Sequence, residues 1–106
     1  MRGTILRFFM DEGERYKGEL LFEWLLEEAK RLGVPGGSAF RAVAGYGRHG
    51  VLHEQTFFEL AGQLPVEVVF VTNAEHADRI LARLSAVGVS VFYARSEAEF
   101  GVTSGK

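Results

Sequence analysis

Two segments with helical spacing, each standing between strand-like segments, constrain the fold of this 106-residue chain most strongly. In residues 19–32 the apolar side chains recur at the intervals of an amphipathic helix, and a second such pattern precedes Gly88. Gly33 and Gly88 stand where these helices are expected to end. Thr72 and Glu75 frame a capping box at the start of the second helix.

Strand candidates surround these helices and are rich in β-branched and aromatic residues, at 4–10, 38–46, 64–71 and 89–95. Segment 47–62 mixes apolar and polar residues and is expected to be a functional loop. The order β-α-β-loop-β-α-β is the split βαβ arrangement. The sequence therefore predicts an α+β fold, a ferredoxin-like βαββαβ sandwich whose antiparallel sheet carries two helices on one face. Residues 1–96 are expected to form this domain, and residues 97–106 a polar C-terminal tail.

The strands are apolar on both faces, which is unusual for an antiparallel sheet with one solvated face. The first strand places Ile5 and Phe9 on one side and Leu6 and Phe8 on the other, and only Glu67 interrupts the third. Monomers rarely expose an apolar face of several hundred Å². We therefore expect another subunit to cover the face that the helices leave open.

Composition excludes several functional classes. The chain has no cysteine, so a disulfide framework, a thiolate metal site and a cysteine nucleophile are ruled out. A net charge of −2 does not favour nucleic acid or an anionic membrane as a partner. No apolar run approaches a membrane span of about 20 residues, and the first residues are too charged for a signal peptide. A cytoplasmic protein is expected. No nucleophile–base pair is visible, so we expect no enzymatic activity.

A glycine motif follows the second predicted strand. Residues 45–50 match the pattern G-x-G-x-x-G, but they lead into a mixed loop, and the nearest acidic candidate, Glu67, lies inside a strand. A dinucleotide-binding fingerprint requires a helix and an acidic strand end at these places, so we reject that interpretation. The glycines could expose backbone amides to an anion beside Arg48, or they could simply form a flexible loop.

Two histidines and a carboxylate in the same segment offer an alternative function. His49 and His53 are four residues apart, and Glu54 follows the second. On a helix this spacing places both imidazoles on one side, as a metal site requires. A metal-binding or metal-homeostasis protein is therefore the alternative hypothesis.

Charged residues inside the apolar strands need partners or a solvated cleft, because an isolated buried charge is costly. These residues are Arg7, Arg41, Glu67 and Arg95. They either pair with one another or with neighbouring carboxylates, or they bind an anionic ligand at a subunit interface.

Several strings together resemble a known family. They are Leu6-Arg7-Phe8, Tyr16-Lys17-Gly18 with Leu20-Leu21-Phe22-Glu23, the stretch from Gly36 to Gly47, Val51-Leu52-His53, and Leu60 to Pro65. In this order and spacing the chain is similar, over residues 5–95, to an uncharacterised bacterial and archaeal family, domain of unknown function 190, grouped with the PII-like signalling proteins. The most specific part is the stretch 41–47, with His53 following.

The resemblance implies a homotrimer whose sheets face inward, in agreement with the two-sided strands. It also implies that segment 47–62 corresponds to the mobile T-loop, which contacts a partner such as a transporter, channel or enzyme. PII relatives bind nucleotides in clefts between subunits near the base of that loop. A small anionic effector, with an adenine nucleotide as the candidate, is therefore expected at Lys17, Arg41, Gly45, Tyr46, Gly47, Arg48 and His53.

One departure affects this expectation. PII proteins hold phosphates partly with a glycine- and lysine-rich connection between the second helix and the last strand. Here the connection is Val87-Gly88-Val89-Ser90, which has no basic residue. Arg48, Lys17 or Arg95 would have to substitute for it.

Overall fold

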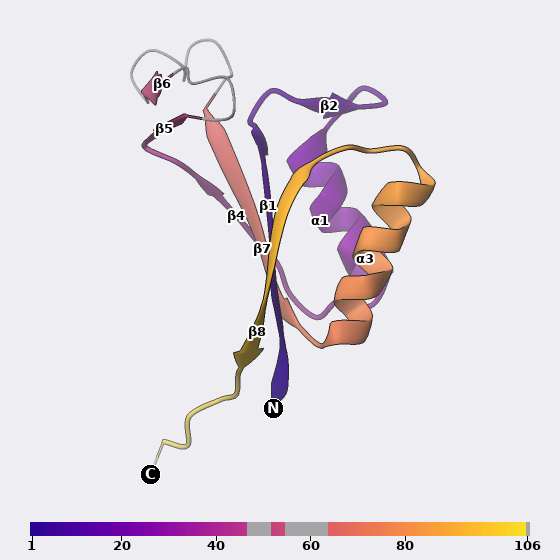
Figure 1. The fold of residues 1–106 in the computed structure, drawn as a ribbon, viewed down its shortest axis with the longest axis vertical. Coiled ribbons are helices and arrows are strands. Elements are labelled where there is room, and N and C mark those ends of the chain that lie inside the picture. Colours follow the sequence, from indigo (N-terminus) through magenta and orange to yellow (C-terminus); the bar gives the residue numbers. More distant parts are fainter. Residues whose placement is uncertain (47–51, 55–63, 106) are drawn as a thin grey trace.

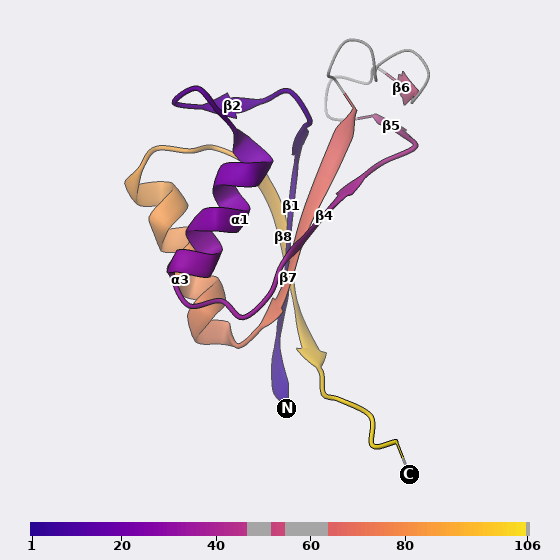
Figure 2. The same ribbon diagram turned by 180° about the vertical axis from the view of Figure 1, so that it is seen from behind.

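The protein is a two-layer sandwich in which a twisted antiparallel sheet carries both described helices on one face (Figures 1 and 2). The computed structural model describes residues 1–46, 52–54 and 64–105. The sheet has the strand order β4-β7-β1-β8, and every neighbouring pair is antiparallel. The predicted α+β ferredoxin-like class, with two helices on one face of the sheet, is confirmed.

The elements follow one another as β1 (Arg2–Asp11), β2 (Arg15–Tyr16), β3 (Glu19–Leu20), α1 (Leu21–Arg31), β4 (Ser38–Arg41), β5 (Ala44–Tyr46), β6 (Leu52–Glu54), β7 (Pro65–Thr72), α3 (Ala74–Ala86) and β8 (Phe92–Glu99). Two small hairpins, β2-β3 and β5-β6, accompany the main sheet. The predicted second strand is divided into β4 and β5, and the last strand begins and ends later than its pattern suggested, at Phe92 and Glu99.

The helices end where their glycines predicted. The cap residue Leu32 is followed by Gly33 in the left-handed region, at φ +94°. The amide of Val34 then donates to the carbonyl of Ala29 at 3.0 Å, which is the closing hydrogen bond of a Schellman motif. Glycine adopts this backbone conformation without the steric penalty of a Cβ atom.

The start of α3 differs from the predicted capping box by one residue. Asn73 is the N-cap, and its side-chain oxygen accepts a hydrogen bond of 2.7 Å from the amide of His76. Thr72 remains in β7 and is buried, and its hydroxyl lies 2.7 Å from Nδ1 of His76. The prediction that Thr72 and Glu75 cap the helix was therefore wrong.

The core lies between the sheet and the two helices. Strands β1 and β7 contribute alternate residues to it, and α1 and α3 contribute their apolar stripes. Its largest fully buried side chains are Phe8, Phe70, Leu6, Leu25, Leu64, Ile80 and Val68. The rings of Phe8 and Phe70 meet edge to face, with centroids 6.2 Å apart.

The opposite face of the sheet, which we call the open face, is apolar and uncovered. Strand pairing places Phe40, Glu67, Phe9 and Phe92 in one row across the sheet. The side chains of Phe40 and Phe92 are 58% and 60% exposed, and that of Phe9 is 36% exposed. Arg7 lies in the adjoining row, opposite Val69, and forms a diagonal ion pair with Glu67, with its Nε atom 3.3 Å from the carboxylate. For Arg7 and Glu67 this contact is the first of the two alternatives given for charges inside apolar strands, namely pairing with one another.

Glu28 joins the two helices, and the stability that it contributes is expected to depend on pH. Its carboxylate forms ion pairs with Arg31 on α1 and, at 2.6 Å, with Nε of Arg83 on α3. Hydrogen bonds first from Arg31 and then from Arg83 hold the pKa of Glu28 below its ordinary value of 4.5. Because the folded-state pKa is the lower one, this contribution is present above pH 4.5 and is lost as the pH falls through the folded value.

We therefore expect Glu28→Gln to lower the free energy of unfolding by less than about 1 kcal/mol at pH 7, since both arginine partners are substantially exposed. The difference should shrink at pH 3, because below the ordinary pKa of 4.5 the unfolded chain binds a proton at Glu28 that the paired carboxylate of the folded chain resists. Urea unfolding at the two pH values measures both. Glu75→Gln, which removes an exposed ion pair within α3, serves as the control and should change little. An equal loss for Glu28→Gln at pH 7 and pH 3 would contradict the assignment.

Candidate functional site

The loop end of the sheet, where β1 finishes at Asp11 and β7 begins at Pro65, carries most of the predicted effector residues. Here Arg41, the last residue of β4, forms an ion pair with Glu12, which follows β1. The amide of Glu12 also donates to the carbonyl of Leu64 at 2.7 Å. Arg41 is therefore held at the base of segment 47–62, with its side chain 49% exposed.

The β5-β6 hairpin brings two further predicted residues to this base. The amide of Ala42 donates to the carbonyl of Pro65 at 2.8 Å, and the chain then turns into β5. In the hairpin ladder Gly45 lies opposite His53. Tyr46 is exposed at the end of β5. The structure thus places Arg41, Gly45 and Tyr46 in sequence along one edge of the loop end, with the His53 backbone beside them.

Lys17 occupies the tip of the other hairpin. Lys17 and Gly18 both have positive φ values, 50° and 82°, as a two-residue loop of type I′ requires between the paired residues Tyr16 and Glu19. The Lys17 ammonium lies 5.6 Å from the centroid of the Tyr16 ring, and this ring packs on Trp24 with a centroid separation of 4.6 Å. The hairpin tip therefore carries a cation beside an aromatic pair.

Lys17 and the residues of the β5-β6 hairpin lie on different sides of the sheet. Both hairpins stand at the loop end, but β2-β3 lies on the helix side of the sheet and β5-β6 on the opposite side (Figures 1 and 2). The predicted effector residues therefore form two groups in a single chain.

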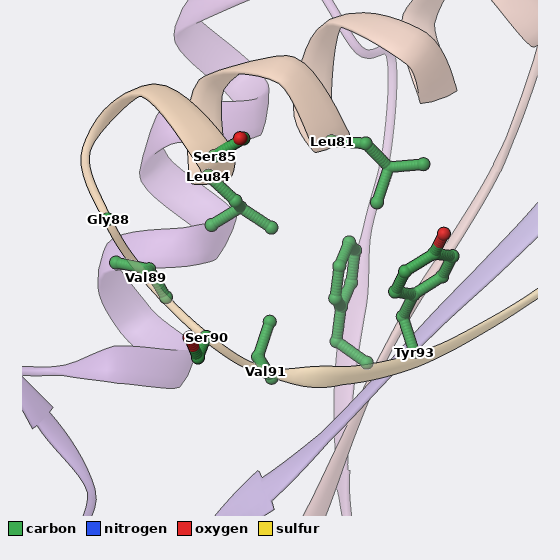
Figure 3. A pocket seen from close by; sticks show the side chains of 9 residues that line it. Leu81, Leu84, Ser85, Gly88, Val89, Ser90, Val91 and Tyr93 are labelled. Carbon is green, nitrogen blue, oxygen red and sulfur yellow. The ribbon is translucent and has the colours of Figure 1, made fainter.

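A pocket of about 520 Å³ opens beside β8 at the loop end (Figure 3). Leu81 and Leu84 line it from α3, Val91 from the connection before β8, and Tyr93 from β8 itself. The buried ring of Phe8 also lines this space, with its centroid 6.2 Å from that of Tyr93. The other lining residues are Ser85, Gly88, Val89 and Ser90.

The end of α3 creates this pocket. Gly88, at φ +75°, follows the helix cap, and its amide donates to the carbonyl of Ser85 at 3.2 Å. The amide of Val89 donates to the carbonyl of Leu84 at 3.0 Å, which completes a second Schellman motif. The chain then returns along the sheet edge to β8, and α3 leaves the edge strand only partly covered. None of the residues described as lining the pocket is charged.

The other predicted site residues lie outside the described part of the chain. This applies to Gly47, Arg48 and His49, while His53 and Glu54 are placed only as members of β6. The metal-site hypothesis rests on these histidines and stays a prediction. Of the remaining strand charges, Arg95 pairs with Asp78 on α3 at 2.7 Å.

Comparison with known proteins then establishes the family. Residues 3–98 match the family DUF190, described as uncharacterized ACR. The chain belongs to this family. A UPF0166 protein of Aquifex aeolicus is 36% identical over 84 residues, which cover 79% of this chain and 80% of the relative. A UPF0166 protein of Methanocaldococcus jannaschii is 32% identical over 87 residues, covering 82% and 80%.

Solved structures extend the likeness of this DUF190 chain to the PII-like fold. CPII, a nitrogen regulatory PII-like protein from Thiomonas intermedia K12, superposes with a TM-score of 0.70 at 14% identity, covering 96% of this chain and 91% of CPII. That protein was solved with ADP, AMP and bicarbonate bound. At this identity the likeness shows the fold, and with the family match it confirms the resemblance seen in the sequence.

Sequence reasoning missed two features of the site. The first is Glu12, which holds Arg41 and lies 29 positions before it in the chain, so that no local pattern links the two residues. The second is the pocket, because Leu81, Leu84 and Val91 are indistinguishable from core residues in the sequence. The sequence shows only a tyrosine, Tyr93, in the predicted last strand, and its half-exposed place in an edge strand is known from the structure.

Proposed function

We propose that this protein is a regulatory, non-catalytic member of the PII-like group that binds a small anionic effector, with an adenine nucleotide as the first candidate. The observation that carries this proposal is the PII-like fold shared with CPII, a protein solved with ADP and AMP bound. The cationic residues Arg41 and Lys17 at the loop end support it, because anions need such partners. Segment 47–62 is proposed to contact the target protein.

The proposal includes assembly as a homotrimer through the open face. The exposed apolar side chains there, Phe9, Phe40, Val71 and Phe92, would be covered by the other subunits. Assembly also offers a route by which Arg41 of one chain and Lys17 of another could meet the same effector. Among the described residues, no helix is both long and apolar enough to cross a membrane.

The ion pair between Arg41 and Glu12 gives the first test. Arg41→Ala should weaken ADP binding at least tenfold, because a charge-assisted hydrogen bond to phosphate is worth about 1.5–3 kcal/mol. Glu12→Gln should strengthen binding, because it removes a carboxylate that competes with the phosphate for the guanidinium. Isothermal titration of the full chain with ADP and with AMP measures both changes.

The control is Arg79→Ala, which removes an equally exposed arginine from the first half of α3. Its titration should match that of the wild type. If Arg41→Ala binds ADP with unchanged affinity, the effector site is misplaced. If the wild type binds neither nucleotide at millimolar concentration, the nucleotide proposal itself is wrong.

A further inference from the structure

An ion pair lies among apolar side chains on the open face. Arg7 belongs to β1 and Glu67 to β7, which are the two central strands of the sheet. All four strands contribute to the apolar surroundings of this pair, with Phe40, Phe9, Phe92, Val69, Ala94, Ile5 and Val71. One cation and one anion therefore interrupt an otherwise apolar part of the surface.

Arg7 and Glu67 use only part of their hydrogen-bonding capacity on each other. The contact joins one nitrogen, Nε, to one carboxylate oxygen at 3.3 Å. A guanidinium carries several N–H donors, and a carboxylate accepts several hydrogen bonds. In a single chain the two side chains are 43% and 37% exposed, so water can serve the remaining donors and acceptors.

Assembly through the open face would remove this water, so the inference rests on the trimer of the proposed function. A charge that is buried without hydrogen bonds to its remaining atoms is costly. Within the described rows of this face the only other charged residue is Asp11, at the loop end beyond the aromatic row. Ser38 and Ser96 add only neutral hydroxyl groups. The charges that can satisfy Arg7 and Glu67 in an assembly are therefore those of another copy.

We propose that Arg7 of each chain pairs with Glu67 of a neighbouring copy, and that this pairing makes the open face selective for copies of the same chain. The face is complementary to itself, because its apolar area carries one cation and one anion. In a cyclic trimer each contact joins two different parts of the same face, so the cation of one copy can meet the anion of the next. An apolar face that lacks these charges would leave both of them desolvated and unpaired, which disfavours a foreign partner.

Exchanging the two charges separates contacts within a chain from contacts between copies. Arg7→Glu combined with Glu67→Arg keeps an ion pair within each chain, and this variant should assemble with itself. Between this variant and the wild type, like charges would face each other across the interface, which is costly. Mixed assemblies should therefore be at least tenfold rarer than random mixing gives.

The matched control exchanges an ion pair that lies outside the open face. Glu75→Arg combined with Arg79→Glu does so on α3, in the helix layer, and should mix freely with the wild type. A wild-type chain extended by a C-terminal peptide tag is co-expressed with each untagged variant. Native mass spectrometry then counts the tagged chains in each assembly, and circular dichroism verifies that both variants fold.

Depletion of mixed assemblies for the open-face exchange alone supports the inference. If that variant mixes with the wild type as freely as the α3 control, the ion pair is confined to single chains, and the inference is overturned while the trimer stands. A variant that folds but does not assemble with itself also overturns it, because the exchange preserves complementarity between copies. A monomeric wild type refutes the trimer of the proposed function, and this inference falls with it.

Discussion

Replacing Phe9 by aspartate is expected to separate the proposed trimer into folded single chains. Phe9 lies in the row that crosses the open face toward its loop end, where its ring contacts that of Phe92 at a centroid distance of 5.7 Å. A carboxylate there would lie opposite that of Glu67, which already pairs with Arg7, and would be desolvated by the neighbouring subunits at a cost of several kcal/mol. Since about 1.4 kcal/mol is a factor of ten in affinity, assembly should weaken by more than about 100-fold.

Light scattering coupled to gel filtration gives the mass of the assembled species, and circular dichroism verifies that the variant folds. Val102→Asp is the matched control, because Val102 is 98% exposed in the C-terminal segment and receives the same charge. This variant should keep the wild-type mass. A Phe9→Asp protein that also keeps it would show that the open face is not the assembly surface, and a monomeric wild type would refute the trimer itself.

Gly37→Ala should destabilise the fold by about 1–3 kcal/mol, the usual cost of overpacking a well-packed site. A Cβ atom at position 37 would lie 2.5 and 2.7 Å from two ring atoms of Phe70. Phe70 is only 1% exposed and is held edge to face against Phe8, so its ring cannot turn away without disturbing the core. At about 4–8 °C per kcal/mol for a domain near this size, the unfolding midpoint should fall by at least several degrees.

The neighbouring glycine gives a matched control. A Cβ atom at Gly36 would meet nothing within 4 Å. Gly36→Ala should therefore be neutral or slightly stabilising, because alanine restricts the unfolded chain. Thermal unfolding at one fixed protein concentration measures both variants. Equal midpoints for the two alanine variants would contradict a close contact between Gly37 and Phe70.

Much of the architecture follows from local patterns. Helical spacing and the terminal glycines located α1 and α3, because a left-handed residue after a helix is a local steric requirement that Gly33 and Gly88 satisfy. Two-sided apolar strands predicted the open face, because side chains alternate along a strand whatever its neighbours are. The division of the predicted strand 38–46 was not predictable, because β4 loses its partner strand where β7 begins, at Pro65.

The candidate site depended far more on contacts between distant parts of the chain. The sequence singled out Arg41 as a charge in an apolar strand, since residue type and strand period are local properties. Only the tertiary structure decided that Glu12 is its partner and that the hairpin carrying Lys17 lies on the other side of the sheet from the β5-β6 hairpin. The pocket also exists only in the folded chain, because it is the space that α3 leaves beside an edge strand, and that space depends on how packed layers meet.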